Sequence, residues 1–237
     1  MKKINNSSEL LWLLGNIFVA LGVAICNKAN LGVSMIAAPA FVIAEAINSL
    51  SIGVTEYIFQ GIILILLCVI IRRFNWRFLL AFAVAVFYGY ILNFFLWLMA
   101  DIQINAVWLR WVMLIIGDCI TGFGVACFFR TYMPIHVYEL FVAEFADRFK
   151  FNINRVKWVF DITLLIVSVV LTLTLFGDIH TFDWKTLGNS SFHSIGLGTI
   201  VITAINSPII SFMGKIIDRT FIATPKFPTL ESTLKRN

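Results

Sequence analysis

The sequence predicts an all-α integral membrane protein with six transmembrane helices arranged as a 3+3 inverted repeat. Of its 237 residues, 60% are hydrophobic and only 13% are charged, and the mean hydropathy is +0.91. Soluble domains carry roughly 45–50% apolar and about 25% charged residues, so this chain has too little polar surface to cover a water-soluble globule. The length fits one membrane domain, residues 1–237.

A helix needs roughly 20 apolar residues to cross the hydrocarbon core of a bilayer. Six runs of the chain meet this requirement: Glu9–Cys26, Val54–Ile71, Phe78–Met99, Trp108–Phe129, Lys157–Phe176 and Ser194–Gly214. Two shorter segments, Ser34–Ile47 and Ile135–Phe149, are helical in composition, and Pro39 is expected to interrupt the first. We expect both to re-enter the membrane or to lie in its interface rather than to cross it.

Two stretches of the chain are similar to each other, which is typical of a fold built by duplication. Shifted by 102 positions, Gly15 falls on Gly117 and Gly22 falls on Gly124. Farther along, the matches are Phe59-Gln60 with Phe160-Asp161, and more loosely Asn93-Phe94 with Ser211-Phe212. Because each unit holds three crossings, the second unit enters from the opposite side. The predicted units are residues 9–100 and 108–215, followed by a short cytoplasmic tail, 216–237.

The distribution of cations supports six crossings with both termini in the cytoplasm. With the six long runs crossing, all but three of the 18 lysines and arginines lie on the side of the termini. Only Lys28, Arg110 and Lys185 remain outside. Crossings by the short segments would move Arg72, Arg73 and Arg77 outside, against the positive-inside rule.

Polar side chains within the crossings are the candidate functional residues, since each must find a partner or water in the bilayer. Asp118 is the strongest, because an ionised carboxylate at a helix centre costs about 2.5–3.5 kcal/mol on insertion scales. Two interpretations of Asp118 remain open: a proton- or cation-linked substrate contact, and a carboxyl that holds the bundle together. The other residues expected along a substrate or ion pathway are Asn16, Asn206, Asp161, Gln60 and Asn93. The glycines expected at close helix packing are Gly15, Gly22, Gly117, Gly122 and Gly124.

No enzyme motif occurs in the sequence, so we expect no catalytic residue and no enzymatic activity. The three histidines are scattered, and the four cysteines lie singly within apolar runs, so we expect neither a metal site nor a cofactor. The basic residues flank apolar runs instead of forming a patch. Nucleic acid is therefore not an expected partner.

Several short motifs resemble one bacterial family. They are Lys28-Ala-Asn-Leu-Gly-Val-Ser34, Met133-Pro134, Val156-Lys-Trp-Val-Phe-Asp161 and Gly196-Leu-Gly-Thr199. With them, nearly the whole chain resembles the YczE/YyaS/YitT-type multi-pass membrane proteins. The resemblance implies a bacterial inner-membrane location and a poorly defined function.

Two functions fit these observations. The first is a small secondary carrier, with a midplane site for a small solute between the inverted halves. The second is a non-transporting membrane partner, either a substrate-capturing subunit of a larger transporter or a scaffold for a membrane enzyme. The expected partners are the lipid bilayer, an unknown small solute, and a second copy of the chain or a partner membrane subunit.

Overall fold

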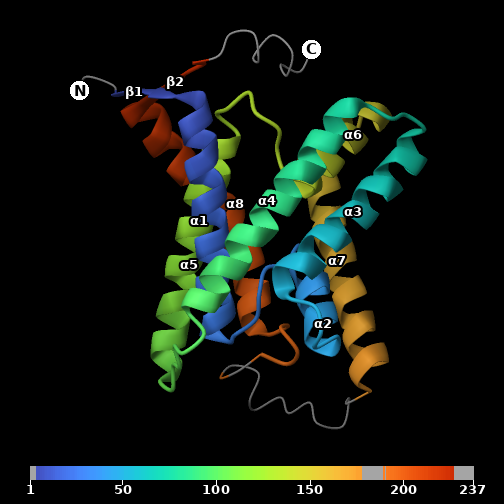
Figure 1. The fold of residues 1–237 in the computed structure, drawn as a ribbon, viewed down its shortest axis with the longest axis vertical. Coiled ribbons are helices and arrows are strands. Elements are labelled where there is room, and N and C mark those ends of the chain that lie inside the picture. Colours follow the sequence, from blue (N-terminus) through green and yellow to red (C-terminus); the bar gives the residue numbers. More distant parts are fainter. Residues whose placement is uncertain (1–3, 178–188, 190, 227–237) are drawn as a thin grey trace.

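The structure is a computed structural model that describes residues 4–177, 189 and 191–226. Eight helices make up almost all of this part of the chain (Figure 1). In order, they are α1 (Ser8–Ala29), α2 (Ala38–Ala46), α3 (Ile52–Ile71), α4 (Trp76–Leu98), α5 (Val107–Phe128), α6 (Val137–Phe149), α7 (Ile153–Phe176) and α8 (Leu197–Thr220).

Six of these helices are long and apolar enough to cross a membrane, which confirms that the chain has six helices of membrane-spanning length. They are α1, α3, α4, α5, α7 and α8. The last helix continues to Thr220, beyond the predicted end of the apolar run at Gly214. This extension carries charged residues, and Asp218 is paired with Arg130 at 2.6 Å. Part of the stretch predicted as a tail is therefore helical.

The two short helices lie toward opposite ends of the bundle, α2 at the bottom and α6 at the top of Figure 1. Pro39 does not interrupt α2, as the sequence suggested, but lies in its first turn. Proline is well suited to this position, because the first backbone N–H groups of a helix have no partner within the helix. The preceding loop turns at Gly32, whose φ of 111° favours glycine.

Helices α1 and α5 run antiparallel in close contact, and four of the predicted packing glycines form their crossing (Figure 1). A methyl group added to Gly22 would lie 2.5 Å from the carbonyl oxygen of Gly117, and one added to Gly117 would lie 2.9 Å from that of Gly22. Gly15 and Gly124 face each other in the same reciprocal way. The fifth glycine, Gly122, faces Ile209 of α8.

The other side of the bundle contains the short helices. α2 packs against α3 and α7, and α6 packs against α3, α7 and α4. α4 also packs against α1 and α3, and its crossing with α3 brings Gly53 against Gly89. Over their described residues, α7 and α8 are not packed together, and Figure 1 shows them as separate walls of the bundle.

The two ends of the described chain are joined by a small parallel pair of strands, which the sequence did not predict. β1 (Ile4–Ser7) pairs with β2 (Phe221–Thr224), in register from Ile4 with Phe221 to Ser7 with Thr224. Ser7 also caps α1, accepting a hydrogen bond from the backbone N–H of Leu10 at 3.2 Å. Both ends therefore lie on one side of the bundle, as an even number of crossings requires.

Candidate functional site

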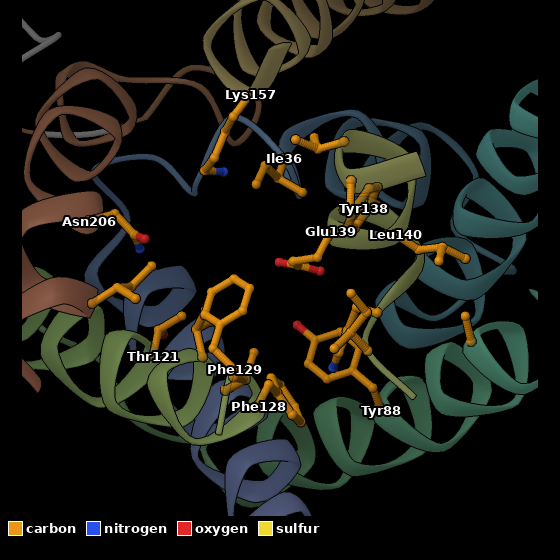
Figure 2. Close-up of a pocket in the computed structure, with 18 of the residues that line it drawn as sticks. Ile36, Tyr88, Thr121, Phe128, Phe129, Tyr138, Glu139, Leu140, Lys157 and Asn206 are labelled. Carbon is orange, nitrogen blue, oxygen red and sulfur yellow. The ribbon is translucent and has the colours of Figure 1, made fainter. Parts of the chain in front are cut away.

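A cavity of about 960 Å³ lies inside the bundle and is lined by residues of α1 and of α3 to α8 (Figure 2). It reaches the side of the chain termini, where Ser8, Arg77 and Pro225 contribute to its wall. Deeper in the bundle it is lined by Asp118 and Ile202. Ligand pockets in proteins have volumes of roughly 300–1,000 Å³, so this cavity has room for a drug-sized molecule.

The starts of both short helices face this one cavity. Residues 33–34 and 36–37, just before α2, line it, as does the loop 128–136 that leads into α6. Glu139 occupies the third position of α6, and its carboxyl accepts a hydrogen bond from its own backbone N–H. A carboxylate at this position is favoured by the partial positive charge of a helix N-terminus. Burial nevertheless raises the pKa of Glu139.

A second carboxyl group enters the wall from α3. Glu56 is 2% exposed, and its Oε1 accepts hydrogen bonds from the Tyr138 hydroxyl at 3.2 Å and the Gln60 amide at 3.4 Å. Its Oε2 has no hydrogen-bond partner among the residues that the structure describes. An unsatisfied buried carboxyl oxygen is costly, so this atom is a point at which a ligand or water would be stabilised.

Aromatic rings surround His136, the residue that precedes α6. Its imidazole lies 4.9 Å from the ring of Tyr88 and 4.9 Å from the ring of Phe128, measured between centroids. Burial lowers the pKa of His136 to about 4, so the ring is neutral at physiological pH. Its Nε2 has no hydrogen-bond partner in the described part of the chain.

The third carboxyl group of the cavity is Asp118, on α5. It is 1% exposed, and its Oδ1 accepts a hydrogen bond from the Asn206 amide of α8 at 2.7 Å. Its Oδ2 has no partner among described residues. In Figure 2, Asn206 lies on one side of the open space, with Glu139 and Tyr88 on the other.

Two of the cations at the cavity wall form ion pairs with acids outside this group of carboxyl groups. Lys157 forms an ion pair with Asp161 at 3.2 Å, and Arg130 forms one with Asp218 at 2.6 Å. Within the part of the chain that the structure describes, Glu56, Asp118 and Glu139 form no salt bridge. Nor do the described residues include a cluster of three histidines, cysteines or carboxylates that could hold a metal ion.

The end of the bundle opposite the termini is held together by hydrogen bonds between the α1–α2 loop and the segment before α8. Gly198 N donates to Leu31 O at 2.9 Å, and Val33 N donates to Ser194 O at 3.0 Å. Glu45, near the end of α2, contacts His193 at 2.8 Å. The cavity thus extends to the end that carries the termini, while hydrogen bonds join the described segments at the other end.

The structure brings two of the six predicted pathway residues, Asp118 and Asn206, together in the cavity. Asn16 is buried in α1, where its amide donates to the Trp12 carbonyl at 3.1 Å, and Gln60 is buried beside Glu56. The remaining two have structural partners.

These two are Asn93 and Asp161. Asn93 accepts from the backbone N–H of Gly53 at 2.8 Å and donates to the Ser51 hydroxyl at 2.8 Å, which fixes the start of α3. Asp161 pairs with Lys157, one of the cations that its sequence neighbourhood offers.

Sequence reasoning missed three residues of the cavity: Glu56, Tyr88 and Glu139. Glu56 lies near the start of a predicted crossing, where a carboxylate suggests contact with water. A signal was present nonetheless, because Glu56 and Gln60 are four residues apart and so share one helix face. Tyr88 and Glu139 become significant only once α4 and α6 are placed beside each other.

Six apolar helices around a central cavity with buried carboxyl groups define a multi-pass membrane protein. Residues 7–215 match a family described as "Family of unknown function (DUF6198)", and the chain belongs to this family. No curated protein and no solved structure matches the chain. The match gives no support for the YczE/YyaS/YitT naming, which stays a prediction.

Proposed function

We propose that this protein is a small secondary carrier of the bacterial inner membrane, which exposes a central site to the two sides of the membrane in turn. The observation that carries the proposal is the cavity itself. It joins buried carboxyl groups to the side of the termini, while hydrogen bonds hold the α1–α2 loop against the start of α8 at the opposite end. A carrier open to one side has this arrangement.

The packing of the helices supports an inverted repeat. α1 and α5 are equivalent by sequence, and their glycines meet reciprocally, as expected for elements related by a two-fold axis. The short helices are consistent with the same two-fold axis, which would relate α2 to α6 and α3 to α7. α2 packs on α7, and α6 packs on α3. In an inverted-repeat carrier the substrate site lies where such halves meet.

The positive-inside rule places the termini, and with them the open end of the cavity, in the cytoplasm. In this proposal the conformation is therefore open to the cytoplasm. Transport would require the α1–α2 loop to separate from the start of α8, while the equivalent loop before α6 closes against the start of α4.

Cysteine accessibility tests the proposal without knowledge of the solute. Ser34 lines the cavity close to α2, and Ser34→Cys, in a chain whose four native cysteines are replaced, places a small reactive group there. A membrane-impermeant maleimide should reach this cysteine from the side of the termini. Adding Glu45→Gln, which weakens the contact with His193, should expose it to the opposite side as well.

The control is Asp147→Asn, which breaks an exposed pair with Lys150 near the end of the other short helix. It should leave labelling at position 34 restricted to the side of the termini. A cysteine that stays closed to the opposite side after Glu45→Gln would contradict the carrier proposal. It would favour the alternative of a non-transporting membrane partner.

A further inference from the structure

We infer that the cavity takes an organic cation with an apolar body, such as a hydrophobic amine or quaternary ammonium compound, and that Glu139 receives its positive charge. This inference names the substrate class of the proposed carrier and rests on that proposal in treating the cavity as the substrate site. Binding of the cation is a property separate from its transport, and the two are measured in separate experiments.

The first argument is charge. Three carboxyl groups, Glu56, Asp118 and Glu139, line the cavity, and each has an oxygen without a hydrogen-bond partner among the described residues. Three cations also line the cavity: Arg77, Arg130 and Lys157. The last two are paired with acids outside this group, although Lys157 lies near enough to act on Glu139 as well. Since burial of an uncompensated carboxylate is unfavourable, a cation entering the cavity would be stabilised there.

The second argument excludes an anionic substrate at the helix N-termini, where carriers often bind one. At α6 that position is occupied by the carboxyl group of Glu139, which bonds its own backbone N–H. At α2 the N–H groups of Ala37 and Ala38 donate to the Ser34 carbonyl at 3.0 and 2.9 Å, and Pro39 has no N–H to offer. At α6 an anion would therefore lie beside a carboxyl group, and at α2 three consecutive residues offer it no free N–H group, so neither helix start favours an anion.

The third argument is the aromatic wall beside Glu139. Tyr88, Phe128, Phe129 and Tyr138 all line the cavity, and Figure 2 shows Tyr88 and Glu139 pointing into the same space. Aromatic faces attract organic cations, most strongly where water is excluded. His136, which lies among these rings, is neutral and so does not repel a cation.

Size separates an organic cation from an inorganic one. A bare metal ion needs several oxygen ligands within about 2–2.6 Å, and the described residues hold no such cluster. The cavity of about 960 Å³ instead suits a molecule with apolar groups. Apolar side chains such as Val19, Val125 and Ile210 would contact its body.

The test uses tetraphenylphosphonium and tetraphenylborate, which have nearly the same size and shape but opposite charge. Binding of each labelled ion to the purified full-length protein in detergent is measured in separate samples. We expect saturable binding of tetraphenylphosphonium and none of tetraphenylborate. Equal binding of the two ions, or no saturable binding of the phosphonium ion, would overturn the inference.

Variants locate the site. Glu139→Gln keeps the size of the side chain and should weaken tetraphenylphosphonium binding by about tenfold or more, because a charge-assisted interaction is lost. Asp147→Asn, on the exposed side of the same helix, is the control and should bind like the wild type. Unchanged affinity in Glu139→Gln would remove Glu139 from the site and refute the inference.

A second variant covers the case in which Glu139→Gln does not fold. Phe129 is 58% exposed and lines the cavity, so Phe129→Leu removes an aromatic face without opening the core. It should weaken binding of the phosphonium ion by several-fold, and undiminished binding would contradict the aromatic part of the inference. If the cation binds as expected but position 34 is never reached from the opposite side, the cation site stands and the carrier proposal fails.

Discussion

Replacing Gly22 with alanine should destabilise the bundle, because α1 and α5 touch there through their backbones. The added methyl carbon would lie 2.5 Å from the Gly117 carbonyl oxygen and 2.6 Å from the Thr121 nitrogen, where ordinary contacts begin at 3.4 Å. The helices would have to separate by about 0.9 Å, and overpacking of this kind costs about 1–3 kcal/mol. The nearest atom, the Thr121 hydroxyl oxygen, could rotate away, but these two atoms belong to the backbone of α5 and cannot move as a side chain could.

The matched control is Gly61→Ala, in the middle of α3. Its methyl group would meet only the ring of Phe82, at 3.0 Å, and a ring can turn aside. We expect this substitution to be neutral or to stabilise by up to about 1 kcal/mol, since alanine favours the helix. The free energy of unfolding is measured by titrating the protein in mixed micelles with SDS.

The pair Gly22 and Gly117 offers a sharper criterion. Because each faces the other, the first alanine already forces the helices apart, and the second should then cost less than it does alone. Equal tolerance of alanine at Gly22 and Gly61, or strictly additive effects at Gly22 and Gly117, would refute a backbone-to-backbone crossing.

Four further predictions concern topology, pH and single polar groups. A cysteine at Asp101 should react with an impermeant label from the side opposite the termini, and one at Arg73 should react from the side of the termini. Labelling of position 73 from the side opposite the termini would refute the six-crossing topology. Because burial lowers the pKa of His136 from 6.5 to about 4, the unfolded chain binds the proton first, and stability should fall as the pH drops from 6.5 toward 4, by up to about 3 kcal/mol. Thermal unfolding of His136→Gln should not show this loss of stability at low pH. Identical pH profiles for the variant and the wild type would show that His136 is not buried. Asn93→Ala should lower the free energy of unfolding by about 1–2 kcal/mol and increase hydrogen exchange in the first turn of α3, since the Gly53 N–H loses its acceptor; unchanged exchange would contradict this role. Asp118→Asn keeps an oxygen for Asn206, so stability should persist while tetraphenylphosphonium binding weakens, and no change in either would leave the carboxylate without a role.

The crossings were predictable because hydrophobic length alone specifies them. The run Trp108–Phe129 differs from α5 by one residue at each end. The end of α8 was not predictable in this way, because Asp218 interrupts the hydrophobic pattern and only its pairing with Arg130 accounts for a charge in that turn. The pairing of β1 with β2 joins opposite ends of the chain, and neither four-residue segment has a sequence pattern that predicts this pairing.

The candidate site was only partly predictable for a related reason. Asp118 and Asn206 stand out singly, since each is a polar group within an apolar run. Glu56 and Tyr138 are 82 positions apart, and their hydrogen bond depends on how the α5–α6 loop places the start of α6 against α3. Local sequence patterns carry no information about that placement.

The two proposed repeat units differ at one crossing, and the difference bears on the route into the cavity. Gly53 and Gly89 let α3 and α4 meet closely, but the sequence matches between the units place Asn154 and Ser207 at the equivalent positions of α7 and α8. Over their described residues these two helices do not pack closely against each other, and residues of both line the cavity. For the proposed carrier, a hydrophobic cation that enters between these two helices would come from among the lipid tails. Its partitioning into the bilayer, and not only its concentration in water, would then set how often the site is filled.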